Sequence, residues 1–185
     1  MSVQAKRRAD YQPPAFSIAT VDLHITLHPT ETKVVSTLSI ARNGAHNAPL
    51  VLDGDGLELN AIAVNGEALS EEFYTLGDNT LSINSELDTF ELVITTTIAP
   101  EHNKALEGLY LSGGAYCTQC EAEGFRPITY FMDRPDVLSV YTVTVVADKS
   151  IPMLPANGNP ALSSAEAGSA SGQLSPTFLS CSIII

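Results

Sequence analysis

Three side chains near the middle of the chain have the types and spacing to bind a positively charged ligand. Gln119, Glu121 and Glu123 alternate along the sequence, and alternate residues of an extended segment lie on the same side. An amide beside carboxylates suits an ammonium group, because opposite unit charges about 4 Å apart attract by roughly 4 kcal/mol at an effective dielectric constant near 20. A solvated acidic loop without a ligand would contain the same residues, so residue type alone leaves both interpretations open.

A second motif could bind a metal or carry redox chemistry. Cys117 and Cys120 form a CxxC pair, the spacing found in zinc knuckles and dithiol redox sites. Structural zinc needs four ligands, and the sequence offers no second CxxC. His24 and His28 could face the same way, but their positions predict an exposed strand face. We therefore expect ordinary reduced cysteines and no metal site in this chain.

The residues around these motifs are predicted to form strands. Val21, Leu23, Ile25 and Leu27 alternate with polar residues, which is the period of a strand with one buried face. No stretch of the sequence has the 3.6-residue period of an amphipathic helix. The sequence therefore predicts an all-β fold, a curved β-sandwich-like domain. Further strands are expected at residues 34–41, 50–52, 57–64, 81–83, 90–98 and 138–147.

Two short motifs predict turns between these strands. Asn65-Gly66 is a strong hairpin signal, because both residue types tolerate a positive φ. Asp53-Gly54-Asp55-Gly56 resembles part of a calcium-binding loop, but the remaining ligands and the terminal glutamate are missing. We interpret this second motif as a turn.

The charge of the chain excludes several classes of partner. Its 185 residues include 21 acidic and 9 basic side chains, which gives a net charge of −12. Without a basic surface the chain cannot displace counterions from phosphates, so we expect no nucleic-acid partner and no anionic membrane partner. The negative field could instead concentrate cationic ligands such as peptide amino termini.

The sequence also carries no recognisable targeting segment. No apolar run reaches the roughly 20 residues that span a bilayer. The basic residues Lys6, Arg7 and Arg8 are not followed by the apolar segment of a secretion signal. Three cysteines do not make a disulfide framework. A cytoplasmic protein is therefore expected.

Composition divides the chain into three parts. Residues 1–9 are interpreted as a flexible lead-in, and residues 10–150 as the β-domain. From Ser150 onward there is no lysine or arginine, and Glu166 is the only acidic residue. Because such a segment buries little apolar surface, residues 151–185 are predicted to be an irregular, disordered carboxy-terminal tail.

The middle of the chain carries a motif of a known family. Thr118-Gln119-Cys120-Glu121 is followed by Gly124-Phe125-Arg126 and then by Asp133-Arg134-Pro135-Asp136. This series resembles the amino-terminal domain of the zinc aminopeptidase N family, especially its bacterial members. Asp10 to Pro14 with Phe16, and Ala105 to Tyr110, also match. The resemblance runs from about residue 11 to about residue 159.

The resemblance implies a role in binding substrate. It assigns Gln119 and Glu121 to the free amino group and first side chain of a peptide, whereas Arg126 and Asp133 would hold the loop in place. Zinc chemistry in that family lies in a following domain with a Gly-Ala-Met-Glu-Asn motif and a His-Glu-x-x-His helix. This chain contains neither motif, so no catalytic residue is assigned and inactivity of the chain alone is expected.

Two interpretations of the whole chain follow. In the first, it is the substrate-anchoring part of a zinc metallo-aminopeptidase that removes amino-terminal residues from peptides, and the missing catalytic domain is its natural packing partner. Because the likeness fades where charged residues vanish, a shifted reading frame or a disrupted gene is one hypothesis for its last stretch. In the second, the chain is a non-catalytic β-domain that binds peptides or a partner protein.

Overall fold

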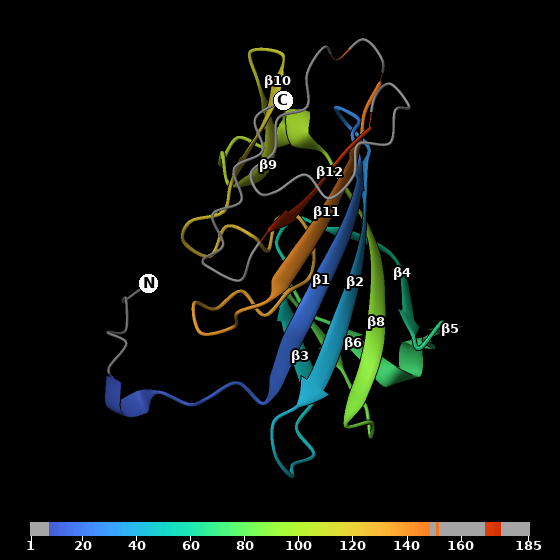
Figure 1. The fold of residues 1–185 in the computed structure, drawn as a ribbon, viewed down its shortest axis with the longest axis vertical. Coiled ribbons are helices and arrows are strands. Elements are labelled where there is room, and N and C mark those ends of the chain that lie inside the picture. Colours follow the sequence, from blue (N-terminus) through green and yellow to red (C-terminus); the bar gives the residue numbers. More distant parts are fainter. Residues whose placement is uncertain (1–7, 149–150, 152–168, 175–185) are drawn as a thin grey trace.

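Most of the predicted strands form one large curved sheet (Figure 1). Its centre consists of β1 (Phe16–Thr26), β2 (Thr32–Arg42) and β8 (Thr89–Ile98), and β4 (Glu58–Val64) with β5 (Glu67–Ala68) forms one edge. The order across the sheet is β12-β11-β1-β2-β8-β4-β5. Register is set by side-chain alternation, which places Val21, Leu23 and Ile25 on the buried face as predicted.

The structure is a computed structural model, and it describes residues 8–148, 151 and 169–174. Within these residues strands account for nearly all regular structure, so the predicted all-β class is confirmed. The smaller elements are a three-stranded sheet of β3 (Leu50–Asp53), β7 (Thr80–Ile83) and β6 (Tyr74–Leu76), a hairpin of β9 (Gly108–Ser112) and β10 (Ala115–Gln119), and the 3₁₀ turns η1 (Arg8–Asp10), η2 (Glu71–Phe73) and η3 (Pro100–His102).

The second edge of the large sheet was only partly predicted. β11 (Val140–Val146) pairs with β1 in parallel, and β12 (Ser169–Leu174) pairs with β11 in antiparallel fashion. β12 lies in a stretch where the sequence predicted no regular structure. The exposed edge of β11 offers backbone N–H and C=O groups that pair with another strand whatever its side chains, so period alone could not reveal β12.

The domain boundaries remain predictions. The rest of the proposed tail, and residues 1–7 of the proposed lead-in, lie outside the described residues. Residue 8 begins η1, the first described element.

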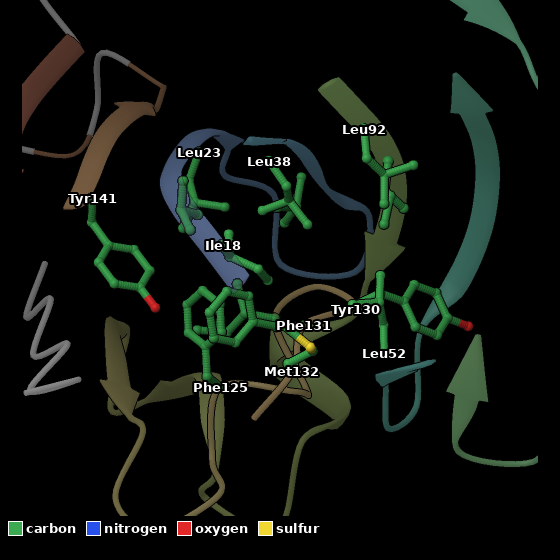
Figure 2. Close-up of a cluster of buried hydrophobic side chains, with 14 of the residues drawn as sticks. Ile18, Leu23, Leu38, Leu52, Leu92, Phe125, Tyr130, Phe131, Met132 and Tyr141 are labelled. Atoms are coloured by element: carbon green, nitrogen blue, oxygen red, sulfur yellow. The ribbon is translucent and has the colours of Figure 1, made fainter. Parts of the chain in front are cut away.

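A single hydrophobic core joins the large sheet to the elements that cover it. Figure 2 shows Leu23, Leu38 and Leu92 from the large sheet facing Phe125 and Phe131, which come from the segment after β10. The Phe125 and Phe131 rings meet edge to face, 5.0 Å between centroids, an arrangement that aromatic quadrupoles favour. The segment that carries the family motif is therefore also a layer of the core.

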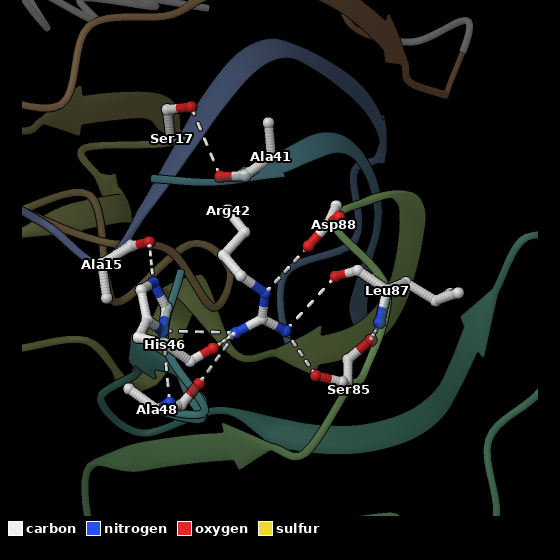
Figure 3. Close-up of polar contacts among 9 residues, drawn as sticks. All are labelled: Ala15, Ser17, Ala41, Arg42, His46, Ala48, Ser85, Leu87 and Asp88. Carbon is white, nitrogen blue, oxygen red and sulfur yellow. Dashed lines mark hydrogen bonds and ion pairs between the residues drawn. The ribbon is translucent and has the colours of Figure 1, made fainter. Parts of the chain in front are cut away.

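At the end of the large sheet where β2 ends, the side chain of Arg42 is buried between two loops (Figure 3). The Arg42 side chain is 5% exposed and lies 3.6 Å from the carboxylate of Asp88. The Nη1 atom donates to the carbonyl of His46 over 3.0 Å. Its guanidinium thereby ties together the two loops that end β2 and precede β8. Further acceptors are the carbonyls of Ala48, Ser85 and Leu87.

The predicted hairpin at Asn65 and Gly66 is confirmed, since both residues have positive φ, 51° and 82°. Gly113 and Gly114 form the corresponding turn of the β9–β10 hairpin, with φ of 58° and 85°. Glycine adopts this left-handed region without steric cost. The second hairpin places Gln119, one of the two predicted binding residues, at the end of β10.

Candidate functional site

Strand β10 fixes the direction of Gln119. Tyr116, Thr118 and Cys120 are buried, whereas Cys117 is half-buried and Gln119 is exposed. This alternation follows from the strand period. Gln119 stands opposite Gly108 at the end of the β9–β10 pairing, so its side chain projects to solvent from a paired backbone.

The chain turns sharply after Gln119, which corrects one prediction. Gln119, Glu121 and Glu123 were expected to share a face of an extended segment, but residues 121–123 form a turn and Glu123 has φ of 63°. The Gly124 N–H donates to the carbonyl of Cys120 over 3.0 Å. A Cβ at position 124 would lie 2.8 Å from the Gln119 carbonyl oxygen, so only glycine permits this close return of the chain.

The turn nevertheless brings the two predicted binding residues together. Gln119 Nε2 donates to the backbone carbonyl of Glu121 over 3.1 Å. That bond orients the amide and leaves its oxygen to accept another donor. Glu121 is exposed, and its carboxylate forms no ion pair within the described part of the chain. The amide oxygen of Gln119 and the unpaired carboxylate of Glu121 thus come from two residues that are joined at one turn.

Glu123 is used differently from Glu121. Its Oε2 lies 3.4 Å from Nη2 of Arg126, in an ion pair between residues three apart. The geometry therefore distinguishes two carboxylates that the sequence left equivalent by type. Glu121 remains available for a ligand, whereas Glu123 contributes to holding the turn.

Arg126 and Asp133 form the ion pair that anchors this loop, as the sequence resemblance implied. Arg126 Nε lies 3.0 Å from Asp133 Oδ2, and Asp133 is 4% exposed. The same oxygen accepts the backbone N–H groups of Phe125 and Arg126 over 3.2 and 3.1 Å. A carboxylate that accepts three donors is well satisfied despite burial. We call residues 119–133 the anchored loop.

The charge of Arg126 is secured by its surroundings. Burial lowers the pKa of Arg126, but the hydrogen bond to Asp133 and the negative charges of Asp53, Asp133 and Glu123 outweigh it and raise that pKa overall. An arginine side chain is charged at physiological pH in any case. The charge that Arg126 contributes to its ion pair with Asp133 is therefore present at that pH.

Asp53 is a residue of this region that sequence reasoning missed. The DGDG motif is a turn as predicted, but Asp53 Oδ2 also accepts the backbone N–H of Asp133 over 3.1 Å. Asp53 and Phe131 pair through their backbones in an isolated antiparallel bridge. Asp53 and Asp133 are 80 residues apart in the sequence, so no local pattern predicts their hydrogen bond. Only an alignment or the tertiary structure could identify it.

The cysteines and histidines do not assemble a metal centre among the residues that the structure describes. Cys117 and Cys120 are not joined in a disulfide there. His24 and His28 are exposed on the polar side of β1 and its turn, as expected. His28 Nδ1 accepts the N–H of Glu31 over 3.1 Å, so this imidazole serves a turn.

One pocket lies next to the hairpin without containing the predicted residues. Its volume is about 310 Å³, and it is lined in part by Asp55, His102, Lys104, Leu109 and Pro127. Neither Gln119 nor Glu121 reaches it. Separately, the described chain contains no helix long and apolar enough to cross a membrane.

Comparison with protein families gives one match that covers most of the chain. The family model described as the peptidase M1 N-terminal domain matches residues 11–178. The match includes the anchored loop and β12, and it extends beyond the region in which the sequence resemblance was noted.

Curated relatives share this region at high identity. Aminopeptidase N of Caulobacter vibrioides is 51% identical over 160 residues, which are 86% of this chain and 18% of that protein. Aminopeptidase N of Escherichia coli is 46% identical over 160 residues, again 18% of its length. The chain thus spans less than a fifth of the relatives that it matches.

Solved structures share the fold. Legionella pneumophila aminopeptidase A, solved in complex with aspartic acid, superposes with a TM-score of 0.85 at 27% identity, over 97% of this chain and 22% of the other. An M1 zinc metallopeptidase from Deinococcus radiodurans gives a TM-score of 0.74 at 19% identity, over 92% of this chain and 42% of the other. The second likeness concerns the fold alone.

Proposed function

This chain belongs to the family of peptidase M1 N-terminal domains, and on that premise we propose that it anchors the amino terminus of a peptide substrate for a zinc metallo-aminopeptidase. The amide oxygen of Gln119 and the carboxylate of Glu121 bind the free amino group. The observation that carries the proposal is the bond from Gln119 Nε2 to the Glu121 carbonyl, which holds both residues at one turn of the anchored loop.

The chemistry of the turn supports an amine ligand. A peptide α-amino group has a pKa of about 7.7–8.0, so much of it is cationic near neutral pH. It carries three N–H donors, and the turn offers an amide oxygen and a carboxylate as acceptors. The aspartic acid in the complex of the Legionella relative is also a molecule with a free amino group.

The strength of this attraction depends on what covers the turn. Two unit charges about 4 Å apart attract by roughly 1 kcal/mol in water but by about 4 kcal/mol at an effective dielectric constant of 20. Glu121 is exposed in this chain, so the lower figure applies to it alone. A second domain over the turn would exclude water and raise the attraction toward the higher figure.

Zinc belongs to another part of such an enzyme. The relative from Deinococcus is described as a zinc metallopeptidase, but the described residues here hold no group of three side chains able to bind a metal. These residues therefore do not fit the zinc site, and the hydrolytic step is assigned to a domain beyond the region matched. In this proposal the chain alone binds substrate without cleaving it.

We further propose that the zinc-bearing domain packs near Leu106. This side chain is 51% exposed, and it lies two residues before Gly108, which pairs with Gln119. Asn103 holds the loop by accepting the N–H of Leu106 and donating to the carbonyls of Glu107 and Leu109. The support for an interface here is the position of this exposed side chain, on a loop held by three hydrogen bonds and two residues before the strand partner of Gln119.

Nuclear magnetic resonance titration of the ¹⁵N-labelled 185-residue chain would test the proposed function. Trialanine with a free amino terminus should shift the Gln119 side-chain amide and the backbone amides of Glu121 and Glu123, with a Kd on the order of millimolar. The acetylated peptide should leave these signals unchanged. Glu121→Gln should weaken binding about fivefold, the effect of losing roughly 1 kcal/mol.

A matched variant makes the titration specific. Glu86→Gln removes the same charge from an exposed residue in the loop that precedes β8, near the Arg42 end of the sheet, and should leave binding unchanged. If both peptides shift the same signals equally, the free amine is not recognised. That result would favour the second interpretation, a β-domain that binds peptides or a partner protein by other contacts.

A further inference from the structure

Asp53 connects the three-stranded sheet to the anchored loop through three hydrogen bonds. Its N–H donates to the carbonyl of Phe131 over 2.7 Å, and the Phe131 N–H donates back over 3.0 Å. Its side-chain Oδ2 accepts the N–H of Asp133 over 3.1 Å. Asp53 is half-buried and ends β3, so its position is set by a paired strand.

Asp133 passes this constraint toward the binding turn. Its Oδ2 accepts the N–H groups of Phe125 and Arg126 and the Nε–H of Arg126. Since Gly124 precedes these residues and bonds back to Cys120, the turn is closed on both sides. A displacement of Asp133 would therefore move Phe125 and Arg126, the residues that follow the turn.

A second contact joins the same two parts of the molecule. The N–H of Asp55 donates to the carbonyl of Arg126 over 3.2 Å. Gly54 lies so close to the Tyr130 ring that a Cβ there would approach it within 2.3 Å. The turn after β3 is thus packed along the anchored loop, and the Asp53 carboxylate is its side-chain link.

We infer that Asp53 is a positioning residue for the amine-binding turn, which comprises residues 119–124. It touches neither the ligand nor Glu121, but it sets where that turn lies relative to the three-stranded sheet. This inference rests on the proposed function of Gln119 and Glu121. The β9–β10 hairpin fixes only the residue that enters the turn, Gln119. The residues that leave the turn are fixed by Asp133, which is held in place by Asp53. A ligand that needs both acceptors at once requires both sides to be fixed.

The test compares three substitutions of Asp53 in the 185-residue chain. Asp53→Asn keeps an oxygen of the same reach for the Asp133 N–H but loses the charge. Asp53→Glu keeps the charge but moves the carboxylate by one methylene. Asp53→Ala removes both. If Asp53 positions the turn, Asp53→Asn should preserve peptide binding better than Asp53→Glu. If Asp53 attracts the ammonium group directly, Asp53→Glu should preserve binding better.

Two readouts separate this inference from the proposed function. Hydrogen exchange of the Phe125 and Arg126 amides reports the position of the turn without a ligand, and trialanine titration reports binding. Asp53→Glu and Asp53→Ala should speed that exchange about tenfold and weaken binding about fivefold, with Asp53→Asn close to the original chain. If trialanine fails to bind the original chain, the proposed function fails while the exchange measurement still decides the positioning role.

Asp55→Ala is the matched control, since it removes a charge from the same turn while its backbone N–H still reaches Arg126. It should alter neither exchange nor binding. Equal effects of Asp55→Ala and Asp53→Ala, or unchanged exchange in Asp53→Glu, would overturn the inference. A loss of global stability in Asp53→Ala with unchanged turn signals would show a structural role alone. If Asp53→Ala does not fold, the order of the Asn and Glu variants still decides.

Discussion

The guanidinium carbon of Arg42 lies 4.8 Å from the centroid of the Phe16 ring. The positive charge over the ring face is a cation–π contact, made at the end of the sheet where β1 begins and β2 ends. His46 packs edge to face on the same ring, and its Nε2–H donates to the carbonyl of Ala15 over 2.8 Å. Arg42 thereby joins the start of β1 to the two loops that end β2 and precede β8.

Arg42→Ala should destabilise the domain by about 2–4 kcal/mol, because it leaves several loop carbonyls without their charged donor. Arg42→Lys should recover part of this loss, since an ammonium keeps the charge but not the planar fork. Lys33→Ala on the exposed face of the same strand should change stability by less than about 0.5 kcal/mol. Urea unfolding would measure all three, and equal losses at positions 33 and 42 would contradict the role given to Arg42.

Gly124→Ala should disturb the binding turn. A Cβ there would meet the Gln119 carbonyl oxygen at 2.8 Å and backbone atoms of Cys120 at 3.0 Å, so the chain must shift at a cost of about 1–3 kcal/mol. Gly113→Ala has open space around its Cβ but a positive φ, which costs roughly 1–2 kcal/mol. The two variants should lose similar stability, yet only Gly124→Ala should move the Glu121 signals and weaken trialanine binding.

Binding of trialanine should fall as pH rises. The amine loses its charge above a pKa of about 7.7–8.0, so affinity should decline progressively between about pH 8 and pH 9.5. A peptide with a trimethylated amino terminus keeps its charge, and its weaker binding should not change over this range. Constant affinity of trialanine across the titration would show that the turn does not recognise the cation.

Asp136 should contribute to stability above the acidic range only. Hydrogen bonds from Arg134, at 2.9 and 2.7 Å, lower the pKa of Asp136 against an opposing effect of burial, and the Tyr11 hydroxyl adds to the lowering. Because the folded pKa is below the unfolded one, the unfolded chain binds the proton more readily. The stabilisation is complete above the ordinary value of about 3.9 and is lost as pH falls through the lowered pKa.

The corresponding experiment is urea unfolding between about pH 2 and pH 7. Asp136→Asn should be less stable than the original chain near neutral pH, and the difference should shrink as acid protonates Asp136 in the original chain. Asp78→Asn, an exposed aspartate in the turn before β7, should track the original chain throughout. A difference between Asp136→Asn and the original chain that is independent of pH would contradict the assigned cause.

Local sequence pattern predicted most of the large sheet. Val21, Leu23 and Ile25 could be placed on a buried face because a strand repeats every two residues, and Asn65-Gly66 indicated a hairpin because of its allowed φ values. Short or edge elements escaped prediction: β6 has three residues, and β12 has no clear alternation. Their pairing depends on a neighbouring strand rather than on their own side chains.

The candidate site was predicted in part. The resemblance proposes Gln119 and Glu121 as binding residues, which stays a prediction, and it gives Arg126 and Asp133 a structural role. The ion pair between the latter two is confirmed. The shared extended face was wrong, because the chain returns at Gly124, whose N–H donates to the carbonyl of Cys120 four residues earlier. Alternation describes strands and says nothing about where a strand ends in a turn.

By itself the sequence determined the all-β class, the main strands, the family and the two proposed binding residues, since each of these depends on local period or on a contiguous motif. Only the tertiary structure decided that Glu121 is unpaired while Glu123 binds Arg126, that Arg42 is enclosed by loop carbonyls, and that Asp53 reaches Asp133. The physical reason is that charge pairing and hydrogen bonding act through space. Residues 80 positions apart in the chain become neighbours only once the two sheets have packed on one core.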